Sequence, residues 1–315
     1  MKKTISASAP GKFHLVGEHS SVYGKPAMLC ALNKRVKVTV EEKDSDNFFI
    51  EDNKAMESVV AIRSYIDKKY KIKTPKFELV VSSQLPIGRG LGSSAAFCAA
   101  VSYALFGLNG LIGSLDEIYE AAYLGEKVFH GNPSGGDLAV SVYGGVIWFR
   151  KETENIKLVR KLKVASSLFS NMLLIDSGKP VEGTYEMVVD VVGRRYKKEQ
   201  VLVEKFLSSQ EKIAKEMSSA MLNHDKNLFE KTISQAGYNL EKLGIVGKQA
   251  KRMIKDIERS GGYVKVSGGG GIKEGSGMLI AISDSKNDMI ELCKENNWEY
   301  LKFNLEQAGV KSENE

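Results

Sequence analysis

A glycine-rich loop carries the strongest chemical signal in the sequence. Residues 85–96 read LPIGRGLGSSAA, in which three glycines alternate with other residues and two serines begin an apolar segment. Glycine permits positive φ angles and close approach of the backbone to a ligand, and the first turn of a helix offers free N–H groups and a partial positive charge. The pattern therefore predicts a phosphate site. Its predicted residues are Pro86, Gly88, Gly90, Leu91, Gly92, Ser93, Ser94 and Ala95.

The loop departs from the common nucleotide-binding motifs. No lysine follows its last glycine, Gly92, as a P-loop requires, and the spacing lacks the final glycine of the dinucleotide fingerprint. The signature segments of protein kinases are also absent from the sequence. A tight turn packed under a helix would equally explain Gly88 and Gly90. From this segment alone, the alternatives are a nucleotide site of another class and a structural turn.

Three charged residues outside the loop could act on a bound phosphate. Asp137 follows a turn rich in glycine and proline, where its carboxylate could accept or orient a hydroxyl group or could stabilise the turn. Lys12 is either a cation at the entrance of a strand or an ordinary surface lysine. Glu126 borders the apolar stripe of an expected helix, so its carboxylate needs a partner. That partner is a lysine, solvent, or a Mg²⁺ ion shared with Ser93 or Ser94, since Mg²⁺ prefers oxygen ligands.

Hydrophobic periodicity places these residues among regular elements of the first half. Alternating valines predict a strand around residues 36–40, and apolar residues at helical spacing predict a helix around residues 59–66. Residues 77–82 read as the strand before the loop, and residues 95–106 as a helix that is apolar almost all round and therefore buried. A capping box, serine followed three residues later by glutamate, predicts a further helix at residues 114–130.

Strands and long helices follow in the rest of the chain. Residues 141–149 resemble a strand interrupted by two glycines, and the polar residues 151–161 lead from it to a strand at 172–176. Long charged helical segments follow between residues 185 and 258, and residues 278–283 read as a strand after a glycine-rich turn.

Length and composition indicate a globular protein with two domains. A chain of 315 residues can bury a sizeable core, and 43% hydrophobic and 27% charged residues are ordinary values for a globular protein. This composition excludes long disorder and a fibrous repeat. We predict a boundary near residue 165, which gives domains at residues 1–165 and 166–315.

Charge and cysteine usage narrow the possible partners. The net charge of +6 is spread over lysine-rich helical stretches, so binding to nucleic acid has little support. The three cysteines lie far apart without metal-ligand spacing, which favours buried free thiols over a disulfide framework or a zinc site. The N-terminus lacks the apolar core of a signal peptide, and no run of about 18 apolar residues occurs, so we expect a cytoplasmic protein with no membrane partner.

Three separated segments resemble the motifs of the GHMP kinases, a superfamily named for galactokinase, homoserine kinase, mevalonate kinase and phosphomevalonate kinase. The loop resembles that family's Pro-x-x-x-Gly-Leu-Gly-Ser-Ser-Ala motif over its whole length. The other two segments are residues 10–27, PGKFHLVGEHSSVYGKPA, and residues 265–271, KVSGGGG. The resemblance spans nearly the entire chain. It implies an α+β fold with an N-terminal α/β domain that carries the phosphate loop, a C-terminal ferredoxin-like domain, and the site between them.

Further segments are most similar to mevalonate kinases. Residues 17–24 lack the Asp-Tyr pair that galactokinases carry after the histidine, residues 130–137 resemble the segment that ends in the catalytic aspartate, and residues 176–184 resemble the family's Asp-Ser-Gly and threonine segment. The chain also departs from the pattern. Gly136 stands where a bulky residue usually precedes the aspartate, residues 267–269 replace Thr-Gly-Ala, and an additional KEGSG segment follows the last motif.

The resemblance implies an ATP-dependent kinase that phosphorylates the 5-hydroxyl of mevalonate with Mg²⁺ as cofactor. It implies catalytic roles for Asp137 and Lys12, metal ligands in Ser94 and Glu126, and substrate contacts from Glu18, His19, Thr184 and Gly269. His19 could equally be structural, and we expect His14, His130 and His224 to be structural because they show no metal spacing. The alternatives are another GHMP kinase acting on phosphomevalonate or a sugar, and a nucleotide-binding regulator without catalysis. A homodimer is left open.

Overall fold

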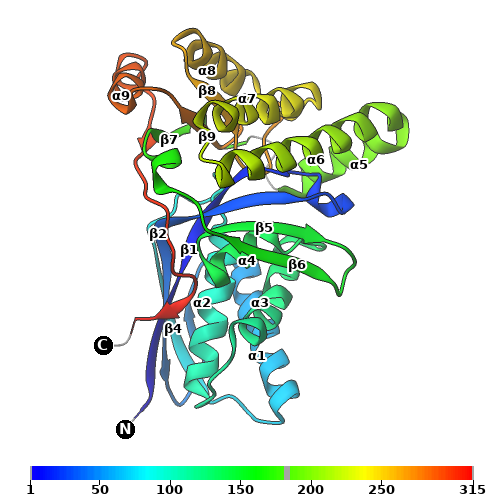
Figure 1. Ribbon diagram of the computed structural model, residues 1–315. Coiled ribbons are helices and arrows are strands. Elements are labelled where there is room, and N and C mark those ends of the chain that lie inside the picture. Colours follow the sequence, from blue (N-terminus) through cyan, green and yellow to red (C-terminus); the bar gives the residue numbers. More distant parts are fainter. Residues whose placement is uncertain (1, 181–184, 314–315) are drawn as a thin grey trace.

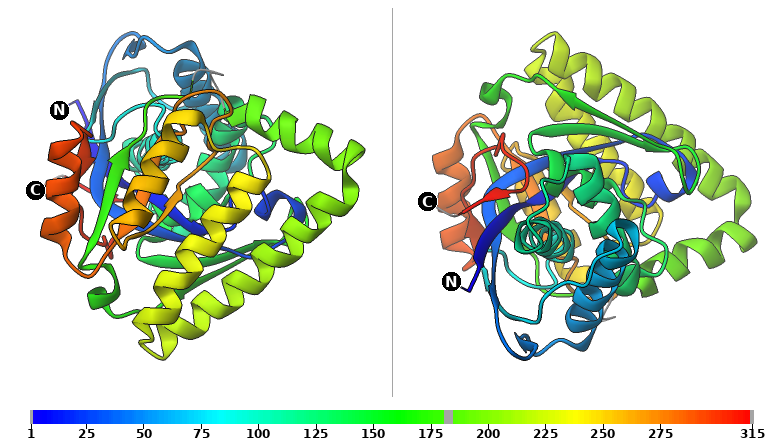
Figure 2. Two further views of the ribbon diagram at one scale, coloured as in Figure 1. Left: turned by 90° about the horizontal axis from the view of Figure 1, so that it is seen from above. Right: turned by 90° about the horizontal axis from the view of Figure 1, so that it is seen from below.

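Two β-sheets, each with helices packed against it, organise the protein. The computed structural model describes residues 2–180 and 185–313. In Figure 1 the first sheet and its helices form the lower half and the second sheet and its helices the upper half, and both chain ends lie beside the first sheet. Figure 2 shows the same two layers from above and from below, with the later helices nearest the viewer in one view and the earlier helices in the other.

The first sheet joins mainly N-terminal strands. They are β1 (Thr4–Val16), β2 (Ala27–Glu42), β3 (Asn47–Phe49), β4 (Phe77–Ser83), β5 (Val146–Lys151), β6 (Lys157–Leu162) and β11 (Lys311–Ser312). The order is β11-β1-β2-β4-β3, and β5 pairs with both β2 and β6. β1 and β2 pair along most of their length, with irregularities between Pro10 and Lys12 and between His14 and Val16. These irregularities lie in the segment that carries the candidate catalytic lysine.

Four helices belong to the same half of the protein as the first sheet. They are α1 (Asn53–Tyr70), α2 (Ser93–Leu108), α3 (Leu115–His130) and α4 (Gly136–Tyr143). α2 packs on β1 and β2 and is flanked by α1 and α3. Because α2 is enclosed on several sides, its apolar residues are almost all buried, as its sequence predicts. The capping box at the start of α3 is also confirmed, since Ser114 accepts from the Glu117 N–H and the Glu117 side chain accepts from the Ser114 N–H.

The second sheet has a ferredoxin-like arrangement. Its strands are β7 (Met172–Asp176), β8 (Tyr263–Val266), β9 (Met278–Ile282) and β10 (Tyr300–Leu301), which run antiparallel in the order β10-β7-β9-β8. Between β7 and β8 come α5 (Tyr185–Lys198), α6 (Gln200–Leu222), α7 (Lys226–Lys242) and α8 (Lys248–Arg259), and α9 (Lys286–Glu295) precedes β10. Short 3₁₀ helices occur at Ser21–Tyr23 and Ser166–Phe169. The predicted α+β fold with a ferredoxin-like second half is confirmed.

The last residues of the chain return to the first sheet. β11 pairs with β1, and Arg35 of β2 donates to the carbonyl oxygen of Gly309 at 2.6 Å and to the Glu306 carboxylate at 3.2 Å. The predicted boundary near residue 165 lies between β6 and β7, and it stays a prediction. Through β11, the C-terminal segment covers the edge of β1 in the first sheet.

Two sequence-based assignments were wrong. Residues 141–143 belong to α4 and not to a strand, because the helix that starts at Gly136 continues until Gly144, which ends it with a positive φ of +68°. Residues 157–162, read as part of a polar connection, form β6. β6 pairs with β5 while most of its side chains face solvent, so it lacks the alternating apolar pattern of a half-buried strand.

Candidate active site

Lys12 is buried in β1 at the centre of a set of polar contacts. Its side chain is only 2% exposed, and its ammonium nitrogen lies 2.9 Å from Asp137 Oδ2. The same nitrogen donates to the carbonyl oxygen of Gly90 at 3.0 Å and lies 3.1 Å from His14 Nδ1. The Lys12 backbone N–H also donates to the Leu91 carbonyl oxygen at 2.9 Å. Lys12 is therefore fixed against the glycine loop and is not a surface lysine.

Asp137 occupies the first turn of α4, where the positive end of the helix favours a carboxylate. Its side chain is 35% exposed, so one side faces solvent while the other contacts Lys12 and His14. Burial alone would raise the pKa of Asp137, but Lys12 and His14 outweigh burial and hold that pKa below its ordinary value. The carboxylate is consequently ionised at neutral pH.

Gly136 departs from the resembled pattern for a packing reason. A Cβ atom at this position would lie 3.2 Å from Phe149 Cδ1 and 3.5 Å from Leu29 Cδ1. Both neighbours are fully buried, so the ring of Phe149 occupies space beside the turn. A larger side chain at position 136 would press on the Phe149 ring.

The glycine loop adopts the backbone geometry that its sequence predicts. Gly88, Gly90 and Gly92 all have positive φ angles, and α2 begins at Ser93 directly after the loop. A Cβ atom on Gly92 would lie 2.7 Å from Lys12 Cγ, and one on Gly90 would lie 2.7 Å from the Ser267 carbonyl oxygen. Gly90 and Gly92 are required both by their left-handed conformation and by this close packing.

The C-terminal glycine motif packs directly against the loop. A Cβ atom on Gly268 would lie 3.0 Å from Gly90 Cα, so the two backbones are in contact. After the motif, the Met278 N–H donates to the Arg89 carbonyl oxygen at 3.0 Å, and Arg89 Nε donates to Asp176 Oδ2 at 2.6 Å. The loop is thus held between the first half and the second half of the chain.

The additional KEGSG segment braces this arrangement. The backbone N–H of Ser276 donates to Ser177 Oγ at 3.0 Å, and the Ser276 hydroxyl accepts from the Gly247 N–H at 2.8 Å. The Gly277 N–H donates to the Gly178 carbonyl oxygen at 2.9 Å. The segment joins the start of α8 to the turn after β7.

Glu126 and Ser94 lie together at the N-terminal end of α2. Glu126 is 3% exposed, and its Oε1 atom is buried with no hydrogen-bond partner among the described residues. Burial raises the pKa of Glu126, and His130 and the Ser94 hydroxyl offset only part of that effect. His130 Nε2 lies 3.1 Å from Ser94 Oγ and 3.9 Å from Glu126 Oε2. An orphaned buried carboxylate oxygen beside a hydroxyl fits the chemistry of a Mg²⁺ ligand set.

Two of the predicted substrate residues, Glu18 and His19, contact the C-terminal glycine motif. Glu18 is buried and forms an ion pair with Lys265, which is itself fully buried. His19 has a left-handed conformation with φ +59°, and its Nε2 atom lies 2.9 Å from the Gly269 carbonyl oxygen. Burial lowers the pKa of His19 to about 4. Thr184 lies outside the described residues.

The structure adds residues to the site that sequence reasoning missed. His14 and His130, both expected to be structural, contact the predicted catalytic pair and the predicted metal ligands. The spacing of Lys12 and His14 was an available signal, because residues two apart in a strand share a face. Lys265 is paired with a residue 247 positions away, which no local pattern indicates.

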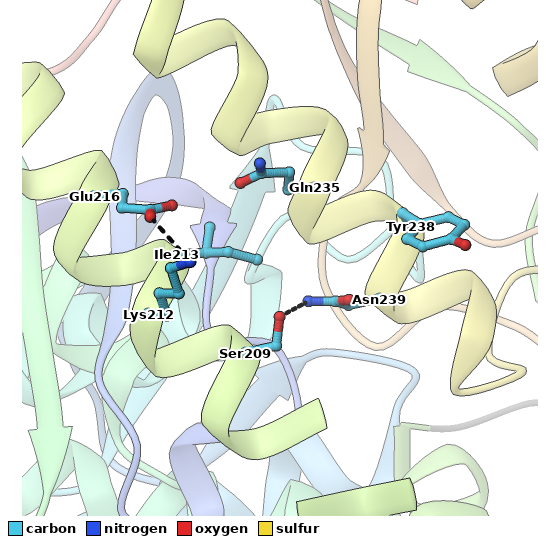
Figure 3. Close-up of a pocket in the computed structure, with 7 residues that line it drawn as sticks. All are labelled: Ser209, Lys212, Ile213, Glu216, Gln235, Tyr238 and Asn239. Carbon is cyan, nitrogen blue, oxygen red and sulfur yellow. Dashed lines mark hydrogen bonds and ion pairs between the residues drawn. The ribbon is translucent and has the colours of Figure 1, made fainter. Parts of the chain in front are cut away.

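A separate hollow of about 250 Å³ lies between α6 and α7 (Figure 3). Its lining is mainly polar, and Asn239 donates to Ser209 Oγ at 2.7 Å within it. The lining residues are Ser209, Lys212, Ile213, Glu216, Gln235, Tyr238 and Asn239. None of them belongs to the glycine loops or to the Lys12 cluster, so this hollow is not the candidate active site.

Known proteins share both the sequence and the fold. Residues 54–145 match the family model described as the GHMP kinases N terminal domain. The chain is 30% identical over 91% of its length to the mevalonate kinase of Pyrococcus abyssi, of which 90% is covered. It is 31% identical over 84% of its length to the mevalonate kinase of Archaeoglobus fulgidus, of which 89% is covered.

A solved structure extends this likeness to the fold. The structure of L. major mevalonate kinase in complex with R-mevalonate has a TM-score of 0.79 at 18% identity, and the match covers 98% of each chain. The chain therefore belongs to the GHMP kinase superfamily and, within it, to the mevalonate kinase family.

Proposed function

We propose that this protein transfers the γ-phosphate of Mg-ATP to the 5-hydroxyl of mevalonate and releases 5-phosphomevalonate and ADP. The observation that carries the proposal is the position of Lys12, whose ammonium nitrogen lies 2.9 Å from Asp137 Oδ2 and 3.0 Å from the carbonyl oxygen of Gly90 in the phosphate loop. This contact joins a carboxylate that can act on a hydroxyl to a loop that can hold a phosphate. Sequence relatives named mevalonate kinase support the choice of acceptor.

Asp137 orients the acceptor hydroxyl and receives its proton. Because the pKa of Asp137 is lowered, the carboxylate is a weak base. It therefore takes the proton as the bond from the acceptor oxygen to phosphorus forms and the hydroxyl becomes acidic. In the same step the bond between the γ-phosphorus and the bridging oxygen breaks, and the electron pair leaves with ADP.

Lys12 and the loop supply the positive charge for this transfer. The Lys12 ammonium stands beside Asp137 and favours the negative charge that develops on the acceptor oxygen. The free backbone N–H groups at the start of α2, together with the positive end of the helix, would bind the phosphates. Phosphoryl transfer asks for such alignment and charge more than for covalent chemistry.

Ser94 and Glu126 would hold Mg²⁺ in this account. When bound, Mg²⁺ neutralises charge on the phosphate oxygens and keeps several non-protein ligands. Among the described residues, no group of three or more His, Cys, Asp and Glu side chains is arranged to hold a metal ion. His130 would orient the Ser94 hydroxyl.

For the acceptor site we propose His19 and Gly269, which are joined at 2.9 Å, together with Glu18 and Thr184. Glu18 would act without touching the acceptor, since its carboxylate is buried against Lys265.

A homodimer and a cytoplasmic location remain predictions, which light scattering and localisation of the tagged protein would test. Over residues 2–180 and 185–313, we find no helix with the length and apolar character needed to cross a bilayer.

A coupled assay of ADP release tests the proposal. Purified protein is supplied with Mg-ATP and, separately, with mevalonate, phosphomevalonate, galactose and homoserine. We expect turnover that depends on mevalonate. Turnover on a different acceptor would replace the substrate assignment with another GHMP kinase activity, and no turnover on any acceptor would favour the nucleotide-binding regulator.

A further inference from the structure

His14 lies between the two residues proposed to carry out phosphoryl transfer. Its Nδ1 atom is 3.1 Å from Lys12 Nζ, and its Nε2 atom is 3.4 Å from Asp137 Oδ1. The side chain is 10% exposed, so protein surrounds the imidazole almost completely. Lys12 and Asp137 also contact each other directly at 2.9 Å. The three side chains thus form a closed triangle beside the phosphate loop.

The contacts determine where the imidazole proton sits. A lysine ammonium can only donate, so the Nδ1 atom that faces Lys12 must accept. In a neutral imidazole the proton is then on Nε2, the nitrogen that lies 3.4 Å from Asp137 Oδ1. The charged and titratable groups that act on the ring are Lys12, Asp137, Lys265 and His19. Burial, followed by Lys12, lowers the pKa of His14 well below its ordinary value, which keeps the ring neutral.

The backbone of His14 is fixed by the second half of the chain. Its N–H donates to Ser267 Oγ at 2.9 Å, and its carbonyl oxygen accepts from Lys265 Nζ at 3.0 Å. Ser267 and Lys265 belong to the C-terminal glycine motif that packs against Gly90 of the phosphate loop. The imidazole therefore cannot turn away from Lys12 through a simple shift of the strand, because both backbone hydrogen bonds would break.

We propose that His14 is a positioning residue for phosphoryl transfer, in which the Nε2-protonated imidazole holds the Lys12 ammonium against the loop and directs an N–H toward the Asp137 carboxylate. The inference deepens the proposed function and rests on it. His14 acts through Lys12 and Asp137 and does not itself exchange a proton with the acceptor.

Kinetics of two substitutions at position 14 test the role. His14→Leu introduces an apolar side chain of similar size and removes both contacts, so kcat should fall roughly 10- to 100-fold, while both KM values change less than about twofold. The acidic limb of kcat/KM should also move to higher pH, because a donor to the carboxylate is lost. His14→Gln can still donate an amide N–H toward Asp137, so its acidic limb should stay near that of the unaltered protein.

A variant at another histidine serves as the control for the two substitutions at position 14. His224→Asn changes an exposed histidine with φ +56°, a conformation that asparagine tolerates, and should leave kcat and the pH profile unchanged. If His14→Leu kept the kcat and the acidic limb of the unaltered protein, the positioning role would be wrong. An equal loss in both position-14 variants with no movement of the limb would also overturn it, since that pattern indicates packing alone.

An NMR experiment separates this inference from the proposed function. The chain contains four histidines, so the long-range ¹H–¹⁵N imidazole spectrum is simple, and the signals absent from His14→Gln identify His14. We expect the Nε2–H tautomer of His14 near pH 7.5, and the Nδ1–H tautomer would contradict the contact with Lys12. This readout needs no substrate. Absence of mevalonate turnover in the unaltered protein would therefore refute the proposed acceptor without deciding the His14 contact.

Discussion

Removal of the Lys265 ammonium should destabilise the protein more than any change of a surface lysine. Lys265 is fully buried in β8 and donates to the Glu18 carboxylate, to the His14 carbonyl oxygen at 3.0 Å and to the Val266 carbonyl oxygen at 2.7 Å. Lys265→Met keeps most of the apolar stem but leaves Glu18 buried without its counter-charge. Breaking one partner of such a pair costs about 3–5 kcal/mol. For a chain of 315 residues we expect the melting temperature to fall by roughly 5–8 °C.

Differential scanning calorimetry at pH 7.5 measures this effect, and the exposed pair on α6 provides a control. Lys212 is 77% exposed and lies 3.7 Å from Glu216, so Lys212→Met should cost less than about 1 kcal/mol. The double variant Glu18→Gln, Lys265→Met should recover part of the loss, because no buried charge is then left without a partner. A melting temperature for Lys265→Met equal to that of Lys212→Met would show that Lys265 does not stabilise the buried Glu18 carboxylate.

Three further changes test other parts of the account. In the folded protein the pKa of His19 is about 4, against an ordinary value of 6.5. The stability that this buried neutral histidine contributes above pH 6.5 is therefore lost as the pH falls toward 4, by up to about 3 kcal/mol. His19→Asn should make the free energy of unfolding, measured with urea, depend less on pH in this range. Gly92→Ala should lower kcat roughly 100-fold, because the added methyl group would displace Lys12. Gly261 also has a positive φ, +83°, but open space surrounds it, so Gly261→Ala should leave kcat unchanged. Glu126→Gln should raise the Mg²⁺ concentration for half-maximal rate about 10- to 100-fold in a Mg²⁺ titration of ADP release.

Local sequence signals predicted the parts of the site that depend on neighbouring residues. The positive φ angles of Gly88, Gly90 and Gly92 and the start of α2 at Ser93 follow from residues within one loop. The capping box of α3 is equally local, since its two side chains lie three residues apart. Such features need no information about the rest of the chain.

The missed features depend on tertiary structure. Lys265 meets Glu18 only because the second sheet brings β8 against the end of β1, and no spacing in the sequence reports that contact. The end of α4, residues 141–143, was read as part of a strand because apolar residues and two following glycines suggest one, whereas packing on β1, α2 and α3 stabilises a helix. His14 was dismissed for lack of metal spacing, although its relation to Lys12 required only the period of a strand.

The most direct test of the central claim compares the unaltered protein with Asp137→Asn under mevalonate and Mg-ATP. ³¹P NMR identifies the product through coupling of its phosphorus to the protons of the C5 methylene, and coupled ADP release measures the rate. The account predicts 5-phosphomevalonate from the unaltered protein and a rate at least about 100-fold lower for Asp137→Asn, because the amide cannot receive the hydroxyl proton. Near-full activity of Asp137→Asn, or a product phosphorylated elsewhere, would contradict it.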